Sequence, residues 1–174
     1  MIEESKGSSQ LAITADTLPI RARVCLALLA ASIALEHLRT SPEFSLARDA
    51  LTLALIWQEG KPVDPDKLGE ALEAEENGIA FAMLRAEERS EQELLAWYVF
   101  GNAIYYCAYH AFHAANREPW GSIGEVTEIA LDYLDKDLRA LEPSSTALMA
   151  RAGAYLEQHP NATLAQLEGQ VSKQ

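Results

Sequence analysis

Apolar residues recur at helical spacing along almost the whole chain, and the apolar–polar alternation of β-strands is scarce. We therefore predict an all-α fold. The connections between consecutive helices are short, which favours antiparallel neighbours and an up-and-down helical bundle of five to seven helices. Proline, glycine and capping residues mark where the helices begin. The expected helices follow Pro19, Pro42, Asp64, Gly78, Ser90, Gly124 and Ser144.

The segment 91–115 is the most apolar of the predicted helices. Its apolar residues point in most directions around the helix axis, which is typical of a helix at the centre of a bundle. Ser90 and Glu93 have the spacing of a capping box at its start. Gly101 and Ala103 are small enough to let a neighbouring helix approach closely. We expect this helix to form the middle of the core.

The chain length suits one domain. We predict a single all-α domain over residues 14–160, preceded by a flexible tail at 1–13 and followed by a weakly specified C-terminal tail at 161–174. Within the domain, Asp64 is a cap candidate and Pro65 suits the first position of the helix that follows.

Trp120 lies in a loop rich in proline and glycine, between two predicted helices. A large ring in such a loop can anchor a protein interface. The alternative is a hydrophobic staple that packs against the start of the next helix. That next helix is strongly amphipathic, and its expected inward face includes Ile129 and Tyr133.

Charge narrows the choice of partners. The chain has 26 acidic and 14 basic residues, a net charge of −12, whereas phosphate contact needs clustered Lys and Arg. Neither nucleic acid nor an anionic membrane is therefore expected as the main partner. Residues 59–93 alone hold eleven acids and four basic residues, a net charge of −7. The candidate partner-binding residues there are Asp66, Glu70, Glu73, Glu75 and Glu76.

A concentrated negative surface would attract a basic protein and raise its association rate by roughly 10–10³-fold at low salt. The alternative is a solvated helix face that keeps the protein soluble. The first hypothesis requires the carboxylates to form one contiguous docking face, whereas scattering or internal ion pairing would remove its physical basis.

The cysteines and the first residues favour a cytoplasmic protein. Cys25 and Cys107 lie inside apolar helical patterns and are expected to be reduced, buried thiols. The polar and acidic first residues lack the basic start and the apolar stretch of a secretory signal.

Residue patterns for catalysis or metal binding are weak. Cys107, His110 and His113 follow at steps of three, so each consecutive pair could share a zinc ion. However, three such steps drift around a helix, and no fourth ligand is evident. The sequence also has no Gly-x-Ser-x-Gly motif and no P-loop lysine. We expect no catalytic residues, no cofactor and no metal.

A family resemblance extends this interpretation. The stretches Ala96-Trp97-Tyr98, Ile104 to Ala111, Glu118-Pro119-Trp120 and Glu125-Val126 resemble the all-α immunity proteins of bacterial polymorphic toxin systems, particularly immunity protein family six. The resemblance implies a cytoplasmic protein that binds one cognate toxin domain and blocks it. It implies no catalytic residues and assigns no interface position.

The leading hypothesis is therefore an immunity protein that blocks a basic toxin domain, such as a nuclease, through its acidic surface. A secretion chaperone or adaptor with a helical groove is the first alternative, and exposed apolar patches would favour it. An enzyme that uses Cys107, His110 and His113 is the second. The sequence leaves the oligomeric state open.

Overall fold

The computed structural model describes residues 16–126 and 129–172, and within them it contains eight α-helices and no strand. The all-α prediction is confirmed, with one helix more than the expected five to seven. The tail predicted at 1–13 lies outside the described residues. The α-helices are α2 Ile20–His37, α3 Phe44–Gln58, α4 Pro65–Glu73, α5 Ile79–Ala86, α6 Glu91–Ala114, α7 Ile129–Leu141, α8 Ser145–Gln158 and α9 Leu164–Val171.

The core is built around α2 and α6, which pack against each other. The apolar helix predicted at 91–115 is confirmed as α6, and Trp97, Phe100 and Phe112 on it are fully buried. Helix α2 buries small side chains such as Ala27 and Ala30, which allow close packing. Both helices are covered on several sides, so their apolar residues need not follow one stripe.

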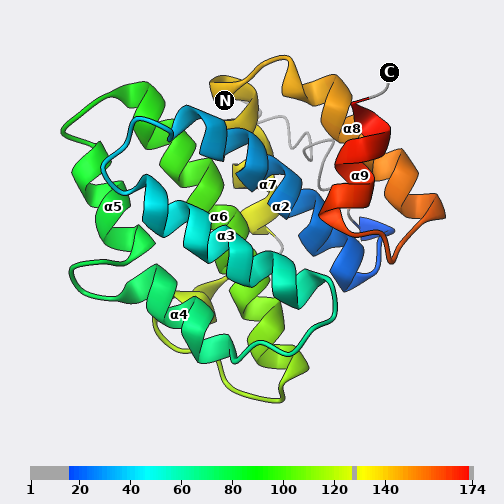
Figure 1. Ribbon diagram of the computed structural model, residues 1–174, viewed down its shortest axis with the longest axis horizontal. Helices are drawn as coiled ribbons and strands as arrows, with labels where there is room; N and C mark the ends of the chain where they lie inside the picture. The colour runs from blue at the N-terminus through cyan, green and yellow to red at the C-terminus, as the bar shows by residue number, and fades with distance from the viewer. Residues whose placement is uncertain (1–15, 127–128, 173–174) are drawn as a thin grey trace, which may run out of the picture.

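The remaining helices surround this pair. In Figure 1, α4 and α5 lie on one side of the molecule, and α8 and α9 lie on the other. Helix α7 packs mainly against α6, and a short 3-10 helix, η1 (Gly121–Glu125), also contacts α6. The acidic segment 59–93 therefore belongs to the α4–α5 side.

The approach of α5 to α6 depends on Gly101. A Cβ atom built on Gly101 would lie 2.8 Å from Sδ of Met83 on α5. This confirms that a small residue at this position lets a neighbouring helix come close. The predicted capping box at the start of α6 is only half formed. The Ser90 hydroxyl accepts the backbone N–H of Glu93 at 3.1 Å, but the Glu93 carboxylate accepts from Arg89 at 2.6 Å.

The structure places a helix, α9, within the stretch that sequence reasoning treated as a weakly specified C-terminal tail. A complete capping box between Thr163 and Gln166 begins this helix. It buries Leu164, Leu167 and Val171. Helix α9 contacts α2 and α8, so this stretch is part of the packed structure.

None of the helices in the described parts of the chain is both long enough and apolar enough to cross a membrane.

Candidate functional site

The predicted partner-binding carboxylates lie on and beside α4. The Asp64 carboxylate accepts the backbone N–H of Asp66 at 3.1 Å, and Pro65 occupies the first turn, as the sequence predicts. Leu68 and Leu72 are buried, which anchors α4 on the core. The acidic residues of α4 recur at intervals of three or four, so they share the outer part of the helix.

Asp66 does not stand free on this surface. Arg117, in the loop after α6, donates to the carboxylates of Asp64, at 2.8 Å, and of Asp66. The indole N–H of Trp120 donates to Asp66 at 3.1 Å. The Arg117 guanidinium, with help from Trp120, holds the pKa of the Asp66 carboxyl below its usual value. Asp66 therefore fastens the loop after α6 to the start of α4.

Trp120 is part of the same attachment. A Cβ atom built on Gly69 of α4 would lie 2.5 Å from Cζ2 of Trp120, so the ring occupies the space that a larger residue would fill. Its edge also meets Phe112, with 6.4 Å between ring centroids. Trp120 thus packs on α4 and α6. It is still 40% exposed, so part of the residue is open to solvent.

Glu73 makes a second attachment between α4 and the segment that follows α6. Its carboxylate accepts from the Tyr105 hydroxyl at 3.1 Å and from the backbone N–H of Ser122 at 2.9 Å. Gly121, with φ +56, brings the backbone against this carboxylate more closely than a residue with a side chain would allow. Burial, and then the negative charge of Glu73, raise the pKa of Tyr105.

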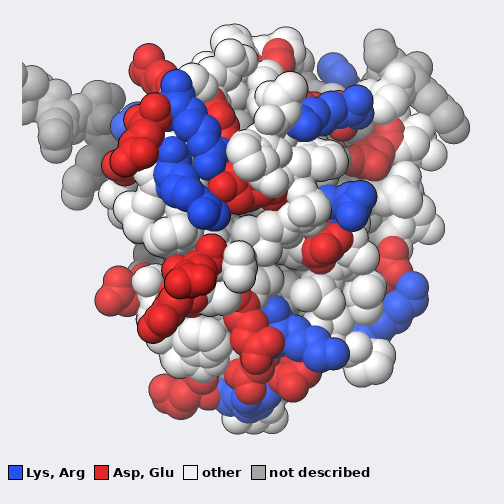
Figure 2. Space-filling view, turned by 60° about the vertical axis from the view of Figure 1, so that its left-hand side comes forward, with Lys and Arg blue, Asp and Glu red and all other residues white. Residues whose placement is uncertain are grey.

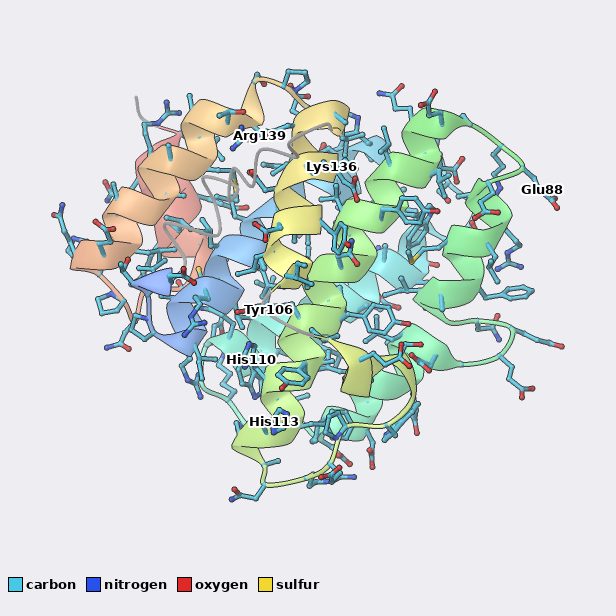
Figure 3. The ribbon with its side chains drawn as sticks, turned by 180° about the vertical axis from the view of Figure 1, so that it is seen from behind. Glu88, Tyr106, His110, His113, Lys136 and Arg139 are labelled. Carbon is cyan, nitrogen blue, oxygen red and sulfur yellow. The ribbon has the colours of Figure 1, made fainter. Side chains whose placement is uncertain are left out.

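The other three predicted carboxylates behave differently. Glu70, Glu75 and Glu76 are exposed and have no hydrogen-bond or ion-pair partner among the described residues. The same holds for three acids that follow α5 or begin α6, namely Glu87, Glu88 and Glu91. Figure 3 shows Glu88 pointing outward from the loop between α5 and α6. The predicted site is thus divided into anchoring and free carboxylates.

The nearby cations are mostly engaged. Arg89 donates to both carboxylate oxygens of Glu43, at 2.7 and 2.8 Å, and Arg85 lies 3.1 Å from the same carboxylate. Lys61 pairs with Glu59 at 2.6 Å. Figure 2 accordingly shows Lys and Arg groups among the carboxylates rather than an unbroken acidic face. The expected contiguous acidic face is thus interrupted by ion pairs, and the excess negative charge comes from the free carboxylates.

Beside this surface lies a groove that sequence reasoning missed. It has a volume of about 520 Å³ and is formed by α5, α6, η1 and α7. Leu84, Ile129 and Tyr133 line it and are 61%, 55% and 55% exposed. The expected inward orientation of Ile129 and Tyr133 is therefore wrong. The apolar stripe of α7 is wider than its contact with α6, which leaves these two side chains exposed.

The candidate metal ligands do not converge. Tyr106, His110 and His113 follow one another along α6 in Figure 3. Cys107 is fully buried with its thiol toward the Ala54 carbonyl, and burial raises its pKa. His110 is buried against the rings of Tyr106 and Tyr109, whereas His113 is exposed. In residues 16–126 and 129–172, no group of three or more His, Cys, Asp or Glu side chains is placed to hold a metal ion.

Comparison with known proteins identifies the family. A family model described as Immunity protein Imm6 matches residues 22–133. No match was found among curated proteins or among solved structures. The matched range includes α4, α5, α6 and η1, and therefore the acids of residues 59–93 and all the residues that line the groove. Because the match spans more than half of the chain, this protein belongs to the Imm6 family of immunity proteins.

Proposed function

We propose that this protein binds and blocks a cationic toxin domain in the cytoplasm, and that its free carboxylates attract that domain. Membership of the Imm6 family supports a role against a toxin. The main support for a cationic partner is the group of unpaired acids on the α4–α5 side. Among the described residues of that segment, only Lys67 is a cation without a partner, so these acids are not neutralised within the protein. These acids are Glu70, Glu75, Glu76, Glu87, Glu88 and Glu91.

A nuclease is the toxin class that best fits this charge. Enzymes that act on nucleic acids hold phosphate groups with Lys and Arg, so their substrate surface is cationic. An acidic protein that covers this surface competes with the substrate and excludes it. The protein then inhibits by occupying the site and performs no chemistry of its own.

The anchoring and free carboxylates have different roles in this proposal. Asp66 and Glu73 hold the loop after α6 and η1 against α4, so they position the surface. Glu70, Glu75 and Glu76 contact and steer the partner. Trp120, fixed on Gly69 and partly exposed, is the aromatic anchor next to them.

The test uses the toxin domain encoded beside this gene. The variant E70Q/E75Q/E76Q removes three free charges, and we expect its association rate to fall by about tenfold at low salt and much less at high salt. The control is E36Q/D49N/E157Q, which removes three exposed charges from α2, α3 and α8. Of these acids, Glu36 and Asp49 pair with neighbouring arginines. Absence of binding, together with no protection of cells on co-expression, would refute the immunity function. Equal losses in both variants would refute the assigned surface.

A secretion chaperone or adaptor is the second candidate, because Leu84, Ile129 and Tyr133 expose apolar surface. A chaperone would bind its client and leave the activity of the client intact. An assay of toxin activity in the presence of a molar excess of this protein separates the two functions, since only an immunity protein abolishes that activity.

A further inference from the structure

The groove beside the acidic surface has fixed walls. Met83 and Leu84 on α5 form one wall, Ile129 and Tyr133 on α7 form the other, and Tyr98 and Tyr105 on α6 lie between them. Gly101 allows α5 to pack closely on α6, and Glu73 holds both Tyr105 and η1. Its volume of about 520 Å³ lies in the range of sites that enclose bulky apolar groups.

The edges of the groove are unusually apolar for a surface. Leu84, Ile129 and Tyr133 come from opposite walls and are each more than half exposed. Single exposed apolar side chains are common, but three that border one concave site indicate a surface that a partner covers.

The charge around the groove indicates the chemistry of that partner. Its charged lining residues within the described parts of the chain are two acids, Glu87 and Glu125, and neither has a partner there. Lys136 lies one helical turn beyond Tyr133 on α7 and does not line the groove (Figure 3).

Carboxylates also lie at both ends of α5, the helix that forms one wall. Glu75 and Glu76 precede α5, and Glu87 and Glu88 follow it. A helix of this length spans about 12 Å. The arginines near the second end, Arg85 and Arg89, are paired with Glu43. A partner segment that lies along α5 would therefore meet unpaired negative charge at both ends and apolar side chains in the middle.

These features disfavour a second copy of the chain as the occupant. The protein has a net charge of −12, and a second copy placed here would bring like charges together. An anionic lipid or nucleotide meets the same repulsion.

We infer that the groove between α5 and α7 receives a bulky apolar side chain of the toxin domain, carried on a segment with Lys or Arg on both sides of it. This inference rests on the proposed function and adds the position and chemistry of the main contact. The acids govern the rate of encounter, and the groove governs how long the complex persists.

The test measures the Kd of the full chain for the toxin domain by calorimetry at low salt and at 0.5 M salt. We expect L84S/Y133S to raise Kd by about 10- to 100-fold at both salt concentrations, and to make the heat-capacity change of binding less negative. I20S is the matched control, because Ile20 is 46% exposed on α2 and does not line the groove. We expect I20S to leave Kd unchanged.

Each other result has a separate meaning. Failure of the unsubstituted protein to bind the toxin domain would refute the proposed function itself. Tight binding that L84S/Y133S leaves unchanged would refute only the groove contact. A dimer in sedimentation experiments that L84S/Y133S dissociates would assign the groove to a second copy and overturn the inference.

Discussion

Trp120 packs against the backbone of Gly69. A Cβ atom at position 69 would lie 2.5 Å from Cζ2 of the indole, which is closer than side chains approach each other in folded proteins. Gly69 lies inside α4, where glycine is normally unfavourable by about 0.5–1 kcal/mol relative to alanine. The contact with Trp120 accounts for a glycine at this position.

Gly69→Ala should displace the Trp120 ring and destabilise the protein by about 1–2 kcal/mol, because the clash outweighs the gain in helix propensity. Gly169→Ala is the control, since a Cβ atom there meets nothing within 4 Å. We expect it to be neutral or to stabilise by up to about 1 kcal/mol. Urea unfolding measures the stability of both variants. An equal gain in stability for both would show that Gly69 is not required for the packing of Trp120.

Glu43 joins the connection between α2 and α3 to the end of α5. The hydrogen bonds from Arg89 are the main reason that the pKa of the Glu43 carboxyl is lowered. Its side chain is only 11% exposed, so we expect Glu43→Gln to cost about 1–3 kcal/mol at pH 7. Glu157→Gln on α8, an exposed residue, should change the free energy of unfolding by less than about 0.5 kcal/mol.

The free energy of unfolding that Glu43→Gln removes should depend on pH, because the pKa of Glu43 is lowered in the folded protein. A carboxyl whose pKa is lowered on folding stabilises the protein fully above its unfolded pKa, and the contribution is lost as the pH falls through the folded-state value. The difference between the natural protein and Glu43→Gln should therefore shrink steadily below about pH 4.5. A difference that is constant from pH 7 to pH 3 would contradict this assignment.

Leu167 tests whether α9 contributes to stability. Its side chain is fully buried, so Leu167→Ala should lower the free energy of unfolding by about 2–5 kcal/mol. Leu84→Ala removes the same atoms from a side chain that is 61% exposed, and its effect should be below about 1 kcal/mol. If chemical denaturation shows a similar small loss of unfolding free energy for both variants, α9 does not contribute to stability.

Both thiols should be unreactive in the folded protein. Burial, together with the charge of Glu168, raises the pKa of Cys25 to about 12, and burial raises that of Cys107 as well. Nucleophilic attack requires the thiolate, so a thiol-specific reagent at pH 8 should label neither residue until denaturant is added. Rapid labelling of one thiol in the native protein would show that its helix opens.

Local signals in the sequence were sufficient to predict where most of the helices lie. The Asp64 cap, Pro65 in the first turn of α4 and the apolar length of α6 each depend on neighbouring residues, and the structure confirms them. Helix α9 was missed although its capping box is local, because eight residues with three buried apolar positions form too weak a stripe to stand out. Its helical state depends on packing against α2 and α8.

The candidate site depends on contacts that no local pattern contains. Asp66 and Arg117 are 51 residues apart, and Glu73 and Ser122 are 49 residues apart. Sequence reasoning could therefore recognise a group of acids but could not separate the anchoring carboxylates from the free ones. The groove was missed because Ile129 and Tyr133 have the periodicity of core residues. Periodicity does not show whether a neighbouring helix packs over them, and in the structure both are exposed.

The double attachment of Glu73 has a consequence for affinity. Because this one carboxylate holds both Tyr105 and the backbone of Ser122, the α4 acids and the groove share one frame before any partner arrives. Little conformational entropy is then lost when a complex forms. Exposed side chains on such a frame can be substituted to suit a partner with an altered surface, while the backbone that presents them keeps its position.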